Sequence, residues 1–174
     1  LSYYDITVKD KIMGFGASKQ QDGTVNSKGF ELELNANPLE GLNLRGGFSY
    51  NDAKVTKSAS RPDLIGKRLA EAGPETSYNF WADYKFLEGI AKNFGLGFGV
   101  NGASDYNTMV GYPTAGDFIL PAYTIFNASL YYEHDKFRIS VKANNLTDKE
   151  YYKGWSTVTP QAPSAFLGTL TYKF

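Results

Sequence analysis

Two glutamates and one histidine are the residues whose types first suggest acid–base chemistry. Glu31 and Glu33 lie two positions apart, so in a strand both carboxylates lie on one face, as a pair for general acid–base catalysis would. Nothing around them predicts a dry pocket that would shift a pKa, so we interpret both as solvated. His134, the only histidine, lies in a predicted turn that does not supply the partners of a metal site or a catalytic triad. We therefore expect no enzyme activity, no metal site and no cofactor.

A second set of residues has side chains suited to binding. Three cations lie close together in one polar stretch, namely Arg61, Lys67 and Arg68. Such a cluster could meet an anionic ligand. Three aromatic residues in other polar stretches, Tyr106, Tyr112 and Trp155, could stack on an aromatic or sugar ligand. For each of the six residues the alternative is an ordinary surface role.

Composition excludes several other classes of protein. The 174 residues contain no cysteine, which excludes disulfides, thiolate metal sites and a cysteine nucleophile. Lys+Arg 18 equals Asp+Glu 18, so no field of one sign is available to attract a nucleic acid, and we expect none as a partner. Aromatic residues make up 16% and glycine contributes 18 residues, a mixture that favours strands and turns.

Alternation of apolar and polar residues predicts eight β-strands. Between positions 137 and 144 every odd residue is apolar and every even residue is polar, so a strand there has one oily and one wet face. The last segment, Phe166 to Phe174, alternates similarly. The other strands are expected near 4–9, 30–36, 42–51, 77–86, 94–101 and 126–133, where Tyr131 falls on the polar side. Tilted strands of about 9–11 residues cross a bilayer.

The connections between these strands alternate in length. Short ones are expected at 37–41, 87–93 and 133–136, and long ones at 14–23, 56–73, 107–118 and 148–162. Outer-membrane barrels have tight periplasmic turns and long outer loops. The alternation therefore predicts an all-β, transmembrane, antiparallel up-and-down β-barrel in contact with outer-membrane lipid, with both chain ends on the periplasmic side. A soluble sandwich would have a charged outer face and no such order of loops.

Several motifs carry a resemblance to a known family. Leu-Pro-Ala-Tyr-Thr at 120–124, Lys-Ala-Asn-Asn-Leu-Thr-Asp-Lys-Glu-Tyr-Tyr at 142–152 and the terminal Phe174 resemble the last three strands of TonB-dependent outer-membrane receptors of the ferric-siderophore type. Ser-Lys-Gly-Phe-Glu-Leu-Glu at 27–33, Ala-Gly-Pro-Glu at 72–75 and Trp-Ala-Asp-Tyr at 81–84 resemble earlier strands and a loop of the same family. The resemblance covers nearly the whole chain.

The resemblance has definite implications for architecture. It implies that residues 1–174 are the C-terminal eight strands of a barrel of about 22 strands with a plugged lumen. The plug domain and the earlier strands would then lie outside this sequence. Glu31 and Glu33 would line the wet lumen and contact the plug. The location implied is the outer membrane of a Gram-negative bacterium.

The resemblance also implies a function. It indicates an active-transport receptor that imports a ferric siderophore or a similar scarce ligand, energised by the TonB complex through the plug region. Tyr172 and Phe174 resemble the C-terminal signal that the barrel-assembly machinery reads by strand addition. Membership of a larger outer-membrane complex remains open. The alternative function is that of a small closed eight-stranded barrel acting as an adhesin or a structural anchor.

Overall fold

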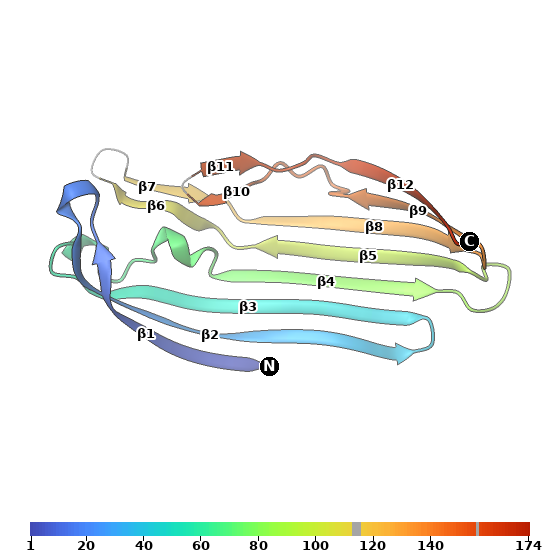
Figure 1. Ribbon diagram of the computed structural model, residues 1–174, viewed down its shortest axis with the longest axis horizontal. Coiled ribbons are helices and arrows are strands. Elements are labelled where there is room, and N and C mark those ends of the chain that lie inside the picture. Colours follow the sequence, from blue (N-terminus) through green and yellow to red (C-terminus); the bar gives the residue numbers. More distant parts are fainter. Residues whose placement is uncertain (113–115, 156) are drawn as a thin grey trace.

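Eight antiparallel strands form one continuous sheet in the computed structural model, which describes residues 1–112, 116–155 and 157–174 (Figure 1). In spatial order they are β1 (Ser2–Met13), β2 (Gln20–Leu39), β3 (Leu42–Lys57), β4 (Thr76–Lys85), β5 (Phe94–Ala103), β8 (Tyr123–Glu133), β9 (Phe137–Asn144) and β12 (Ala165–Tyr172). Each strand pairs with the next of the eight along the chain, so the sheet is an up-and-down meander. β1 and β12 are its two edges, and the described strands do not close into a barrel.

All eight expected strands are present, but the first three are much longer than the sequence predicts: β1 has 12 residues where 4–9 was expected. β2 has 20 residues and β3 has 16, and their ladder runs from Thr24 opposite Lys57 to Leu39 opposite Leu42. The segment 14–23, expected as a loop, is shorter, because Met13 of β1 already pairs with Gln20 of β2. β2 and β3 are therefore well above the length of about 9–11 residues that crosses a bilayer.

The long connections contain structure of their own. Short 3₁₀ helices lie in the first two: η1 (Gly16–Ser18), then η2 (Pro62–Leu64) and η3 (Ala70–Ala72). The segments 107–118 and 148–162, expected as loops, hold two hairpins, β6 (Tyr106–Tyr112) with β7 (Gly116–Leu120) and β10 (Tyr152–Trp155) with β11 (Thr157–Pro160). Pairing satisfies backbone groups that an irregular loop would leave open. No helix in the described parts of the chain is long and apolar enough to cross a membrane.

The two ends of the sheet differ, as the alternation of loop lengths predicts. Figure 1 shows the two small hairpins and the 3₁₀ helices at one end and the short turns at the other. The C-terminus lies at the end with the short turns. All four long connections of this chain thus lie at the same end of the sheet.

The apolar face of the sheet is uncovered by protein. Leu32, Phe98 and Leu130 are 50%, 49% and 49% exposed, although such side chains are normally buried in soluble domains. Aromatic rings pack along this face instead of into a core, as with Phe98 and Phe126 at a centroid distance of 6.0 Å. An apolar face of this size fits contact with lipid.

The largest group of buried apolar side chains lies among the long connections rather than between layers. Met13, Val55, Leu64 and Val110 form a buried cluster, with Val25, Leu69 and Ala70 packed against it. These residues come from β1, β3, η2 and β6. The long connections therefore have a small hydrophobic core that holds them in place.

Candidate ligand-binding site in the long connections

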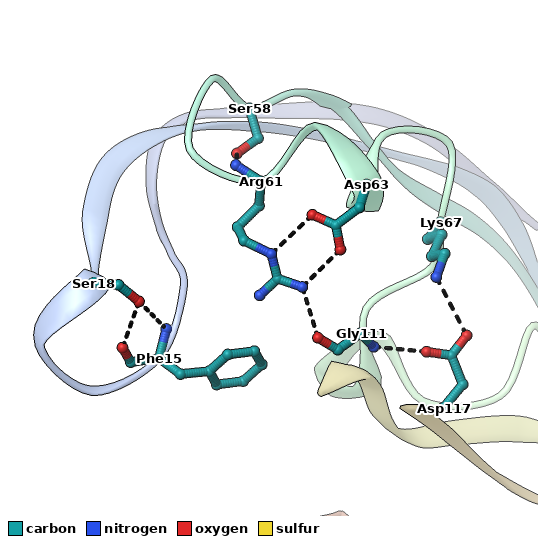
Figure 2. A network of polar contacts seen from close by, with 8 residues as sticks. All are labelled: Phe15, Ser18, Ser58, Arg61, Asp63, Lys67, Gly111 and Asp117. Carbon is teal, nitrogen blue, oxygen red and sulfur yellow. Dashed lines mark hydrogen bonds and ion pairs between the residues drawn. The ribbon is translucent and has the colours of Figure 1, made fainter. Parts of the chain in front are cut away.

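Arg61 joins three of the long connections. Its Nε and Nη2 donate to the two carboxylate oxygens of Asp63 at 2.9 and 2.8 Å, and Nη2 also donates to the carbonyl of Gly111 at 2.7 Å (Figure 2). The guanidinium lies over the ring of Phe15, 5.1 Å from its centroid. The hydrogen bond with Asp63 raises the pKa of Arg61, and the same bond lowers the pKa of Asp63. Both groups are therefore charged and committed to each other at neutral pH.

Lys67 reaches the same hairpin from the other side. Its Nζ lies 3.4 Å from Oδ2 of Asp117, whose Oδ1 accepts the backbone N–H of Gly111 at 2.6 Å (Figure 2). Gly111 is thus bound at its carbonyl by Arg61 and at its amide by Asp117. Its φ of +63° is a conformation that glycine adopts without steric cost. These contacts join Gly111 of β6 and Asp117 of β7 to the segment 61–67.

Arg68 stabilises the end of its own loop. Its guanidinium donates to the carbonyls of Gly73, Ala72 and Pro74 at 2.8, 3.0 and 2.8 Å, and also to the carbonyl of Asn51. Desolvation by burial lowers the pKa of Arg68, although a guanidinium stays charged at neutral pH. Its donors are directed at backbone oxygens, so its geometry is that of a loop clamp.

Asp22 anchors the beginning of the same loop. Its Oδ1 accepts hydrogen bonds from the hydroxyls of Ser60 at 3.0 Å and Ser58 at 3.4 Å, while Oδ2 accepts the backbone N–H of Ser60. Ser58 in turn accepts the N–H of Arg61 at 3.0 Å. Sequence reasoning did not identify Asp22. The only signal was a pair of serines just before Arg61, which marks a turn without naming its partner.

The predicted aromatic residues have different environments. The hydroxyl of Tyr106 donates to the carbonyl of Gly154 at 3.1 Å and accepts the Gly154 N–H at 3.2 Å, which joins β6 to β10. Trp155 is 63% exposed. The backbone of Tyr112 ends β6, but its side chain lies outside the described residues. A ligand-binding role for all six predicted loop residues stays a prediction.

A pocket of about 200 Å³ lies where the four connections meet. Its lining includes Ile12 from β1, Phe15 from the first connection, Leu69 and Ala70 from the second, Met109 from β6 and Trp155 from β10. The buried cluster of Met13, Leu64 and Val110 also contributes to its wall. We call this the loop pocket. It brings together Trp155, which the sequence predicts as a binding residue, and apolar residues that sequence reasoning did not single out.

The residues considered for acid–base chemistry lie elsewhere. Glu31 and Glu33 are exposed on β2, and Ser2 donates to Glu31 at 3.5 Å. His134 lies in the β8–β9 turn, where its ring stacks on Phe137 at 4.8 Å. The described residues contain no group of three or more His, Cys, Asp or Glu side chains placed to hold a metal ion. At the chain end, the rings of Tyr172 and Phe174 contact each other edge to face at 5.3 Å.

The polar face of the sheet explains why Tyr131 breaks the alternation of β8. The hydroxyl of Tyr131 donates to Oδ1 of Asp83 at 3.1 Å, and the guanidinium of Arg138 lies 4.2 Å from the centre of the Tyr131 ring. On the neighbouring strand the ring faces Gly95, where an added Cβ would lie 2.0 Å from Cζ of Tyr131. The ring therefore occupies the space that a glycine leaves free.

Comparisons with known proteins agree with the sheet and its loops. A family model described as TonB dependent receptor-like, beta-barrel matches residues 1–146. The ferric-pyoverdine M114 receptor PbuA of Pseudomonas sp. strain M114 is 31% identical over 149 residues, 84% of this chain and 17% of that receptor. The metal-pseudopaline receptor CntO of Pseudomonas aeruginosa is 32% identical over 162 residues, 90% of this chain and 22% of that receptor. The chain thus spans about a fifth of the length of these relatives.

Solved structures share the fold. The receptor FpvA of P. aeruginosa, bound to a heterologous ferric pyoverdine, superposes with a TM-score of 0.80 at 18% identity, covering 99% of this chain and 24% of that chain. The siderophore receptor PiuA of Acinetobacter baumannii superposes with a TM-score of 0.80 at 18% identity, covering 99% of this chain and 25% of that chain. Nearly the whole sheet, with its loop hairpins, is therefore a known arrangement of strands.

Proposed function

This chain belongs to the TonB-dependent receptor β-barrel family, and from that premise we propose that it forms part of the wall and outer loops of a receptor that imports a ferric siderophore. The family comprises outer-membrane receptors rather than enzymes. The receptor would lie in the outer membrane of a Gram-negative bacterium, and the TonB complex would energise import through a plug region outside this sequence. Relatives named as ferric-pyoverdine and metal-pseudopaline receptors support iron or metal chelates as the cargo.

The observation that carries the proposal is the asymmetry of the sheet, which differs between its two faces and between its two ends. One face is apolar and uncovered. The four long connections lie at the end opposite the short turns (Figure 1), and residues from all four line the loop pocket. A membrane-embedded sheet whose long outer loops are structured suits a surface receptor. The alternative, a small closed barrel that serves as an adhesin or anchor, is not favoured, because β1 and β12 remain separate edges and the matching solved chains are about four times as long.

Two further partners belong to the proposal. Tyr172 and Phe174 lie at the end of the edge strand β12 or just beyond it, where the barrel-assembly machinery could add a strand to the exposed edge. Membership of a larger outer-membrane assembly stays a prediction.

Uptake of radioactive iron tests the proposed function. The full-length receptor that carries this chain is expressed in a Gram-negative strain lacking its own siderophore receptors, and cells are supplied with labelled ferric siderophores of several chemical classes. We expect accumulation of at least one class, and we expect removal of TonB to abolish it while surface binding persists. If no class accumulates above the empty-vector strain although the receptor is present in the outer membrane, the import function is wrong.

A further inference from the structure

The loop pocket is built from segments far apart in the chain. Its wall is well packed, because Leu64 and Val110 in it are only 3% and 5% exposed and belong to the buried cluster. Its rim includes Trp155, 63% exposed. A large apolar ring left open to solvent beside a preformed apolar pocket is a typical arrangement for binding an organic ligand.

The charges around the loop pocket do not suit an anion. None of its described lining residues is Lys or Arg, and the one charged lining residue, Glu71, is paired with Nζ of Lys11 at 2.9 Å. The nearby cations of the second connection are already engaged: Arg61 with Asp63 and Gly111, Lys67 with Asp117, and Arg68 with backbone carbonyls. An anionic group that entered this pocket would lose water without gaining a cation, which is costly.

The volume of the loop pocket limits what can enter it. A dry cavity of about 150 Å³ holds a benzene molecule, so about 200 Å³ accepts one ring or a short alkyl chain. A complete iron chelate does not fit. The metal centre would therefore remain outside, and the exposed face of Trp155 would cover the part of the ligand nearest the rim.

We propose that the loop pocket binds an uncharged, apolar limb of the chelate, and that the receptor therefore takes an electrically neutral hydroxamate-type ferric complex in preference to a polyanionic catecholate. This inference rests on the proposed function and specifies its substrate class. In a ferric trihydroxamate the three hydroxamate anions cancel the charge of iron(III), so the alkyl linkers enter the pocket without a buried charge. A ferric tris-catecholate keeps net negative charge, which the pocket does not compensate.

Calorimetric titration of the full-length receptor in detergent tests the assignment with two probes, a ferric trihydroxamate with alkyl linkers and a ferric tris-catecholate. Three variants are compared. Trp155→Ala removes the rim, Ala70→Trp fills the pocket, and Ile65→Ala is the control, because Ile65 is an exposed apolar residue of the same connection that does not line the pocket. Each variant is first checked for unchanged heat-resistant migration on gels.

We expect the trihydroxamate to bind more tightly than the tris-catecholate. We also expect Trp155→Ala and Ala70→Trp to weaken trihydroxamate binding by about tenfold or more, and Ile65→Ala to change it by less than about twofold. Tighter binding of the tris-catecholate, or unchanged trihydroxamate binding in both pocket variants, overturns the inference and leaves siderophore import intact. If neither probe binds, the neutral ligand class is wrong, and the uptake assay with other classes decides separately whether import itself fails.

Discussion

Gly111 shows how a single residue sets the arrangement of the loops. Its carbonyl accepts from Arg61, its amide donates to Asp117, and its φ is +63°. An added Cβ would lie 2.6 Å from Nη2 of Arg61 and 2.8 Å from Cδ2 of Leu64. Any side chain here would therefore displace the guanidinium from the hairpin and disturb the buried cluster beneath it.

Gly111→Ala should loosen the contact between the segment 61–67 and the β6–β7 hairpin. The positive φ alone costs about 1 kcal/mol for a residue with a Cβ, and the clash with Arg61 and Leu64 adds to it. Hydrogen exchange of the full-length receptor should show faster exchange in both segments. Gly66→Ala is the matched control, because Gly66 has a φ of +83° but nothing within 4 Å of an added Cβ. Equal effects of the two variants would show that the Arg61 contact does not hold the loops together.

The sequence shows that the loops contain three cations close together, but it does not show which groups these cations contact. Arg61, Lys67 and Arg68 are close in sequence, so they suggested one basic surface. Their partners include an aspartate and a glycine about 50 positions further along, as the contacts of Lys67 with Asp117 and Arg61 with Gly111 show. Backbone carbonyls, which satisfy Arg68, leave no trace in the sequence at all. Trp155 could be named as a candidate because a tryptophan in a polar stretch is unusual in itself, and its binding role stays a prediction.

The glycines of β5 leave space for aromatic rings on the two adjacent strands. Gly97 and Gly99 lie on its polar face against the indole of Trp81 on β4, and an added Cβ would approach that ring to 2.5 and 2.2 Å respectively. On the other side Gly95 faces the ring of Tyr131 on β8. Glycines that weaken a strand in isolation are useful here because rings from both adjacent strands fill the space above them.

Gly99→Val should destabilise the barrel through the contact with Trp81. Valine favours a strand, so a loss of stability would come from overpacking, for which about 1–3 kcal/mol is typical. The temperature at which the full-length receptor loses its compact gel migration should fall. Gly168→Val on β12 is the control, since nothing described lies within 4 Å of an added Cβ there. The double variant with Trp81→Ala should recover part of the loss, and no recovery would mean that the indole is not the cause.

Strand positions were predictable where two solvents act on the two faces. All eight strands of the sheet followed from alternation, because lipid selects apolar residues on one side and the wet side selects polar ones. The outer part of β2, from Gln20 to Gly29, is polar or glycine at nine of its ten positions and gives no such signal. The β6–β7 hairpin was missed for a different reason, because its apolar residues come in runs without alternation, at 109–110 on β6 and 118–120 on β7. β10 and β11 have only four residues each, too few to show a period. In the outer part of β2, backbone pairing makes the strand, and pairing has no period in the sequence.

At the scale of the whole molecule, the sheet is incomplete as a membrane structure. β1 and β12 each have a described partner on one side only. Backbone groups left unpaired in hydrocarbon cost several kcal/mol each, and an open edge is a template for pairing with another chain. The matching solved chain of FpvA is about four times as long as this chain.

Residues 1–174 expressed alone and refolded into detergent micelles should not form a compact monomer. The two edges would instead pair between copies, so we expect mixed oligomers that trypsin degrades and that migrate on gels as unfolded chains. The full-length receptor, refolded in parallel, should give a protease-resistant and heat-resistant band and so show that the conditions permit folding. A protease-resistant eight-stranded monomer would mean that β1 and β12 can pair with each other. That result would restore the small closed barrel as the better description, because closure removes both edges without any further strand.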